Sequence, residues 1–338
     1  MTGEDRKRFM GLWMVGIKKQ LTRPLVLRNI LSLLKIMVGV ALLIVSIRGI
    51  QWENLVTGIR SANPAWVVLA IGSILFGLFL KIWRWALLVR NYGIRATKTR
   101  LFSAFFVGQA VNILLPFRGG ELVRIGFFAD KPKTLPEVAS TIVLEKYLDL
   151  LGLTICGIWI SFTISLENIF DARKWLLPLT GIFTLLLLAT IVFGPAVWKK
   201  IRAKGIVPNW MVDWVDRWVR TSQWLKNPRQ IAPLILLTLL IWGVMWLTNL
   251  LLFRSFGLHL GGSAAGLVLV LVYVGLLPAL MPGNIGPFYF FARLALLPFG
   301  IIQDQAIVYA VVLHAIVTLP ALLGGLIGLV VKQHQVAV

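Results

Sequence analysis

Long apolar runs alternate with short basic connections along most of this chain. Six runs approach or exceed the roughly 20 residues that an α-helix needs to cross a bilayer. They cover residues 30–47, 65–89, 138–162, 175–193, 231–253 and 306–331. None shows the alternating pattern that is typical of a transmembrane β-strand. The pattern therefore predicts an all-α membrane protein, a polytopic helical bundle.

Two further apolar segments are interrupted by proline and glycine. Residues 101–115, about 22 Å of helix, are followed by Pro116 and Gly120. Residues 266–280 are followed by Pro282 and Gly286 in the same Pro-x-x-x-Gly spacing. We expect each segment to form a re-entrant hairpin with a broken helix, which enters the membrane, turns and returns. Ordinary spans with proline kinks are the alternative.

The two halves of the chain share the order span, broken hairpin, span. The first repeat covers about residues 65–162 and the second about 231–331. The first repeat is expected to start outside and the second inside, so the two are predicted to be inverted repeats. Inverted repeats with paired broken helices are typical of secondary transporters, which hold their ligand near the bilayer midplane.

Lys and Arg are concentrated beside alternate spans. Residues 1–29 hold seven of them, residues 81–100 six and residues 195–230 eight. By the positive-inside rule these regions, and both termini, are cytoplasmic. We expect a basic amphipathic segment at 1–29, a transmembrane domain at 30–338 and an interfacial amphipathic helix in the loop 195–230. The predicted location is the cytoplasmic (inner) membrane of a prokaryote.

The net charge of +21 also bears on partners. Because the basic residues flank the spans, they indicate contact with membrane lipids and anionic headgroups and not with nucleic acid. One cysteine and three widely separated histidines give no disulfide and no metal-ligand spacing, so we expect no cofactor and no metal. The sequence does not predict the oligomeric state.

Charged side chains inside apolar segments of the first repeat are the strongest functional signal. A charge at the bilayer centre costs about 2.5–3.5 kcal/mol on insertion scales, so it persists by pairing, by lining a cavity or by meeting a ligand. The charges in question belong to Arg118, Glu121, Arg124, Glu145, Lys146 and Asp149. They sum to zero, so a purely structural ion-pair cluster is the alternative to a site.

The break after residue 115 has the features of a binding site for phosphate. Gly119 and Gly120 let the backbone turn tightly and let a ligand approach it. Arg118 carries a forked donor that suits phosphate. Glu121 and Arg124 are three apart on the following helix and are expected to pair.

Glu145 and Asp149 are four apart on the next span, so both carboxylates face one side of it. We expect them to bind a cationic group of the headgroup or a coupling proton. Polar side chains extend the predicted site over both hairpins. The whole predicted site is Gln109, Asn112, Arg118, Gly119, Gly120, Glu121, Arg124, Glu145, Lys146, Asp149, Asn284 and Arg293.

These residues carry a resemblance to a known family. The segment Asn112-Ile-Leu-Leu-Pro-Phe-Arg-Gly-Gly-Glu-Leu-Val-Arg124 and the segment Ser140-Thr-Ile-Val-Leu-Glu-Lys-Tyr-Leu-Asp149 resemble the transmembrane region of lysylphosphatidylglycerol synthases. That region defines a wider group of flippase-like integral membrane proteins. The resemblance extends from about residue 30 to 331. Tyr289 departs from it, because many members have Glu there.

The resemblance implies lipid translocation and not lipid synthesis, because nothing here resembles the soluble aminoacyl-transfer domain of the synthases. Members of the wider family are associated with aminoacylated phospholipids, polyprenyl-phosphate sugars and hopanoid-linked lipids. We therefore expect a flippase or scramblase for a phosphate-bearing lipid, without enzymatic activity. The alternatives are an intramembrane lipid transferase that uses Glu145 and Asp149, and a secondary transporter of small solutes.

Overall fold

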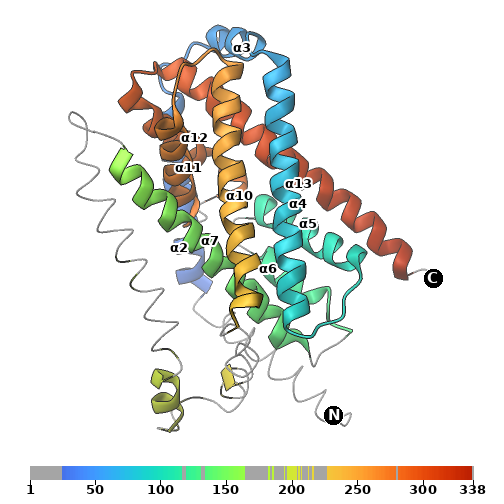
Figure 1. The fold of residues 1–338 in the computed structure, drawn as a ribbon. Coiled ribbons are helices and arrows are strands. Elements are labelled where there is room, and N and C mark those ends of the chain that lie inside the picture. Colours follow the sequence, from blue (N-terminus) through green and yellow to red (C-terminus); the bar gives the residue numbers. More distant parts are fainter. Residues whose placement is uncertain are drawn as a thin grey trace.

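The computed structural model describes residues 25–115, 119–130, 134–163, 227–278 and 281–336, with scattered positions between 182 and 216. All regular elements among these residues are helices, and they form one elongated bundle (Figure 1). The prediction of an all-α protein is confirmed. The predicted span 175–193 and the amphipathic helix expected in the loop 195–230 lie largely outside the described residues. So does most of the basic segment 1–29.

Within the described ranges, three helices are long and apolar enough to cross a membrane. They are α4 (Pro64–Asn91), α10 (Pro228–Ser255) and residues Gln303–Lys332 of α13 (Gln303–Val336). Two more helices, α2 (Leu25–Ile47) and α7 (Leu135–Thr163), match the predicted spans 30–47 and 138–162. The short helix α3 (Trp52–Arg60) connects α2 to α4.

Helices α4 and α10 begin in the same way. The side chains of Asn63 and Asn227 each accept a hydrogen bond from the backbone N–H two residues later, at 3.0 and 3.1 Å. Each asparagine is followed by a proline in the first turn. Proline has no backbone N–H, but N–H groups in the first turn have no acceptor within the helix, so no hydrogen bond is lost. An Asn-Pro pair thus sets the start of both helices.

Helices α4 and α10 are antiparallel neighbours (Figure 1). The Asn63 N–H, at the start of α4, donates to the carbonyl of Ser255, at the end of α10, at 2.7 Å. Nearer the middle, the hydroxyls of Ser73 and Thr248 are 2.7 Å apart. The two helices therefore run in opposite directions, side by side.

Both expected interruptions end a helix. In the first, α5 (Lys98–Leu114) is followed by α6 (Gly120–Gly126). In the second, α11 (Gly262–Leu276) is followed by the 3-10 turn η3 (Pro282–Asn284), α12 (Ile285–Leu296) and the turn η4 (Leu297–Phe299). Gly283 and Asn284 have φ angles of 65° and 52°, a left-handed backbone that does not continue a helix.

The helix before each break packs on the last helix of the opposite half of the chain. Helix α5 packs on α13, where a Cβ on Gly324 would lie 2.3 Å from a Phe106 ring atom. Helix α11 packs on α7, where a Cβ on Gly266 would lie 2.2 Å from Ile160. Small residues thus allow close helix contact at both places. Helix α2 packs against α12.

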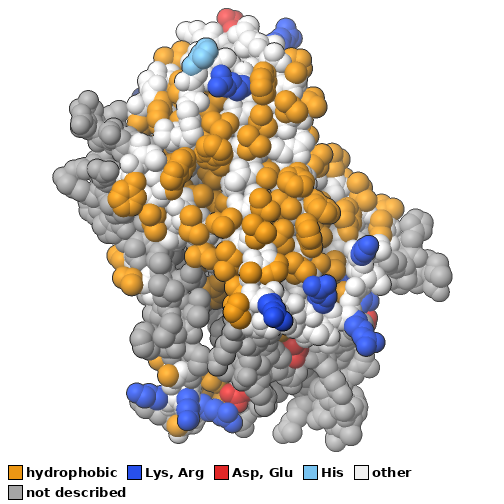
Figure 2. Space-filling view, in the orientation of Figure 1, with side chains coloured by type: hydrophobic (Ala, Val, Ile, Leu, Met, Phe, Trp, Pro, Cys, Tyr) orange, Lys and Arg blue, Asp and Glu red, His pale blue; other side chains and the backbone are white. Residues whose placement is uncertain are grey.

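The outer face of the bundle is apolar over a broad band, and Lys and Arg gather toward its ends (Figure 2). The band includes exposed aromatic and aliphatic side chains of α4 and α10, such as Phe76 and Phe79 (52% and 57% exposed) and Leu236 (58%). Large exposed apolar surface is unusual for a soluble monomer. The surface and the helix lengths together indicate a multi-pass membrane protein.

Candidate functional site

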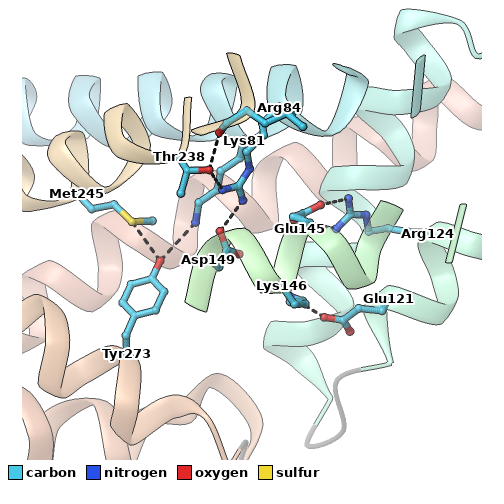
Figure 3. A network of polar contacts seen from close by, with 11 residues as sticks. Lys81, Arg84, Glu121, Arg124, Glu145, Lys146, Asp149, Thr238, Met245 and Tyr273 are labelled. Carbon is cyan, nitrogen blue, oxygen red and sulfur yellow. Dashed lines mark hydrogen bonds and ion pairs between the residues drawn. The ribbon is translucent and has the colours of Figure 1, made fainter. Parts of the chain in front are cut away.

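Three ion pairs join α4, α6 and α7 inside the bundle (Figure 3). All three have one member on α7, within a stretch of five residues. The pairs are Arg84–Asp149 at 2.5 Å, Arg124–Glu145 at 2.6 Å and Lys146–Glu121 at 3.0 Å. We call these six side chains the ion-pair network. It contains five of the predicted site residues and one that was not predicted.

The Arg124–Glu145 pair is the most deeply buried. The two terminal guanidinium nitrogens donate to the carboxylate, at 3.2 and 2.6 Å, and the side chains are only 5% and 6% exposed. The guanidinium carbon also lies 4.0 Å from the centroid of the Trp85 ring. Two charge-assisted hydrogen bonds and a cation–π contact thus compensate the desolvation of both charges.

Arg84 is fully buried and was missed as a site residue. It donates to Asp149 and, at 3.0 Å, to the hydroxyl of Thr238 on α10. The positive-inside prediction counted it among the cytoplasmic charges of residues 81–100, whereas the structure places it inside α4, fully buried and paired with Asp149. Its position inside the apolar run 65–89 was the signal that identified it as a membrane charge.

The expected pairing of Glu121 with Arg124 is also wrong. The two side chains do share a face of α6, but that face is turned toward α7. There Glu145 and Lys146 offer opposite charges, so both pairs form between helices. The Glu121–Lys146 pair is the more accessible one, with side chains 19% and 44% exposed.

The glycines of the first break bring α5 and α6 into contact. The Gly120 N–H donates to the side-chain oxygen of Asn112 at 2.8 Å. A Cβ on Gly120 would lie 1.8 Å from the Gly108 carbonyl oxygen, so no larger residue fits there. Gly119 directly precedes α6, and Gln109 is half-buried on α5. Arg118 lies outside the described residues, so its predicted role stays a prediction.

Among the described residues, no hydrogen bond or ion pair joins the second break to the ion-pair network. Asn284 lies in η3, which packs against α5, and its side-chain oxygen is buried without a hydrogen bond. Arg293 donates to the carbonyl of Val45 near the end of α2, at 3.0 Å. Arg293 therefore links α12 to α2, whereas Asn284 belongs to a turn that packs against α5.

A second polar contact lies beside the network (Figure 3). The Lys81 ammonium, three residues before Arg84 on α4, is 3.4 Å from the hydroxyl of Tyr273 on α11. That hydroxyl lies 3.2 Å from the sulfur of Met245 on α10. Lys81 was counted as a cytoplasmic charge too, and the structure instead places it within α4.

Potential metal ligands are sparse in the part of the chain that the structure describes. It contains no group of three or more His, Cys, Asp or Glu side chains that is placed to hold a metal ion. Two of the carboxylates on α7, Glu145 and Asp149, are each held by an arginine instead.

Comparison with known proteins decides the family. The chain matches the family described as the lysylphosphatidylglycerol synthase TM region over residues 32–325. It belongs to that family. It is also 25% identical over 283 residues to a UPF0104 membrane protein of Methanothermobacter thermautotrophicus, covering 74% of this chain and 80% of that relative. The resemblance expected from the two motifs is confirmed.

Proposed function

We propose that this protein is a flippase or scramblase, which moves a phosphate-bearing lipid between the leaflets of a prokaryotic cytoplasmic membrane. The observation that carries the proposal is the ion-pair network, which lies between largely apolar helices. A lipid headgroup needs a polar surface to cross about 30 Å of hydrocarbon. Charged and hydroxyl groups from α6, α7, α4 and α10 offer such a surface beside the first broken helix.

The side chains of the ion-pair network differ in their exposure to solvent. The Arg124–Glu145 pair is almost fully buried, whereas the side chains of Asp149 and Lys146 are 28% and 44% exposed. Under this proposal the buried pair fixes the positions of α6 and α7. The exposed members, together with Gln109, Asn112 and the backbone at Gly119 and Gly120, meet the headgroup.

We further propose that the two halves are inverted repeats with re-entrant hairpins. Three features support this. The leading helices α4 and α10 are antiparallel neighbours that both begin with Asn-Pro. Each hairpin packs on the closing helix of the other half, α5 on α13 and α11 on α7. In each repeat the break follows the second helix, α5 in the first repeat and α11 in the second.

This arrangement favours lipid transport over an intramembrane transferase. A diphosphate-binding transferase needs carboxylates available to share a metal ion. Here Asp149 and Glu145 each contact a guanidinium at 2.5 and 2.6 Å. Membership in a family named for a lipid synthase region further favours a lipid over a small solute as the transported molecule.

Reconstitution of the purified protein into liposomes tests the proposal. One set of vesicles carries fluorescent phosphatidylglycerol in the inner leaflet, and a matched set encloses a fluorescent small anion. We expect protein-dependent appearance of the labelled lipid outside, with no release of the small anion. Release of the anion without movement of the lipid would instead support a small-solute transporter.

A further inference from the structure

Lys81 has no carboxylate partner in the part of the chain that the structure describes. Its ammonium contacts the Tyr273 hydroxyl at 3.4 Å. Among the described residues no Asp or Glu oxygen lies within the 4.0 Å that defines an ion pair with it. By contrast, Arg84, Arg124 and Lys146 each have their own carboxylate. The ion-pair network and Lys81 together therefore carry one net positive charge.

The position of Lys81 along α4 makes this excess charge costly. Helix α4 has 28 residues, and Lys81 lies only about 5 Å from its midpoint at 1.5 Å of rise per residue. The charge therefore lies well inside the roughly 30 Å hydrocarbon layer if α4 spans it symmetrically. Intramembrane charges of this kind are rare and usually mark a ligand or an ion path.

The groups around the Lys81 ammonium suit an anion. Tyr273 offers its hydroxyl to the sulfur of Met245 at 3.2 Å, and a thioether is a weak acceptor. A phosphate oxygen is a much stronger acceptor, so this hydroxyl gains by turning to it. The Tyr273 ring packs against Trp242, with ring centroids 4.8 Å apart, which holds the hydroxyl in place.

Arg84 lies one turn away on the same helix, but it is fully buried and its charge is already paired. Its terminal nitrogens are taken by Asp149 and Thr238, at 2.5 and 3.0 Å. Its Nε has no hydrogen-bond partner in the described part of the chain. Lys81 thus carries the uncompensated charge, and Arg84 carries a charge that Asp149 already neutralises.

We propose that Lys81 and Tyr273 bind the phosphate group of the transported lipid. This inference rests on the proposed function and deepens it, because it places the anionic part of the headgroup between α4 and α11. Both side chains are half-buried, so the phosphate is reached from the bundle surface without displacing the core. Helices α4 and α11 belong to opposite halves of the chain, so the bound phosphate lies between the two repeats.

Binding of tritiated phosphatidylglycerol to the purified protein in a zwitterionic detergent tests this inference without a transport assay. Hydrogen bonds to charged groups contribute about 1.5–3 kcal/mol, so we expect Lys81→Gln to weaken binding about tenfold or more. Tyr273→Phe, which keeps the ring packing, is expected to weaken binding severalfold. Lys81→Arg is expected to retain most of the affinity.

Arg90→Gln is the matched control, because Arg90 is an exposed cation on the same helix. It is expected to bind phosphatidylglycerol like the wild type. Thermal unfolding of each variant shows whether it is folded. Wild-type affinity in folded Lys81→Gln and Tyr273→Phe overturns the inference, and so does equal weakening by Arg90→Gln.

Two further ligands separate a lipid phosphate from a free one. Diacylglycerol has the tails without the phosphate, and inorganic phosphate has the anion without the tails. We expect neither to compete well with phosphatidylglycerol. Tight, Lys81-dependent binding of inorganic phosphate alone would overturn the lipid assignment. Lys81-dependent lipid binding without lipid movement in liposomes would contradict the proposed function and leave this inference standing.

Discussion

Individual charged side chains in this protein are stabilised mainly by partners on other helices. Arg124 reaches from α6 to Glu145 on α7, and Arg84 reaches from α4 to Asp149. Neither arginine pairs with a neighbour on its own helix. Each buried charge therefore depends on the correct packing of at least two helices, and removing one partner leaves the other uncompensated in a medium of low dielectric constant.

Replacing one member of the most buried pair is expected to destabilise the fold. Arg124→Met leaves Glu145 unpaired, and breaking a buried pair costs about 3–5 kcal/mol. We expect a clearly lower midpoint of thermal unfolding in detergent.

The double variant Arg124→Met/Glu145→Leu is the control, because apolar residues of similar volume replace both charges. It is expected to recover most of the lost stability. A double variant no more stable than Arg124→Met would contradict this account of the pair.

Helices in this protein pack most closely at glycines, which have no side chain. The tightest place is the first break, where Gly120 of α6 lies against the carbonyl of Gly108 on α5. This contact places Glu121 and Arg124, which follow on α6, opposite the charged stretch of α7. The close contact between α5 and α6 therefore also determines which charges on α7 the side chains of α6 meet.

Gly120→Ala is predicted to separate α5 from α6, because the added Cβ would lie 1.8 Å from the Gly108 carbonyl oxygen. We expect weaker accumulation in the membrane, a lower unfolding midpoint and loss of lipid movement.

Gly126→Ala is the matched control on the same helix, since a Cβ there meets nothing within 4 Å. It is expected to behave like the wild type. Similar behaviour of the two alanine variants would show that the close contact is not required.

The sequence predicted the helices and the breaks well because both depend on local properties. Apolar runs of sufficient length and the Pro-x-x-x-Gly pattern are visible without tertiary information. The partners of the charges were predicted less well. Spacing along α6 suggested a Glu121–Arg124 pair, but the choice between that pair and Glu145 depends on which helix faces α6. Arg84 and Lys81 were assigned to a loop because the charge count extended into the end of α4.

At the scale of the whole molecule, the two halves are interleaved and not placed side by side as separate units. Helices α4 and α10 pack together, and each hairpin packs on the final helix of the other half. Lys81 on α4 and Tyr273 on α11 therefore come from different halves of the chain. A relative movement of the halves would change the surroundings of the proposed phosphate site, as alternating access requires.

The proposed topology is tested by cysteine labelling in a Cys156→Ser background. If α5 and α6 form a re-entrant hairpin, Ala129 lies on the cytoplasmic side and Ser61, before α4, lies on the outer side. We expect a membrane-impermeant maleimide to label Ser61→Cys in right-side-out vesicles and Ala129→Cys only in inverted ones. Labelling of both positions from the outside would mean that α5 and α6 together cross the membrane.

The central claim is that the ion-pair network forms the path of a lipid headgroup through the bilayer. The most direct measurement is the rate at which inner-leaflet fluorescent phosphatidylglycerol becomes accessible to dithionite in proteoliposomes. We predict that wild-type protein raises this rate well above that of protein-free vesicles. The folded Glu121→Gln/Lys146→Gln variant, which removes both charges of the most exposed pair in the network, is predicted to give the protein-free rate. A wild-type rate equal to that of protein-free vesicles, or an equally fast folded double variant, would contradict the claim.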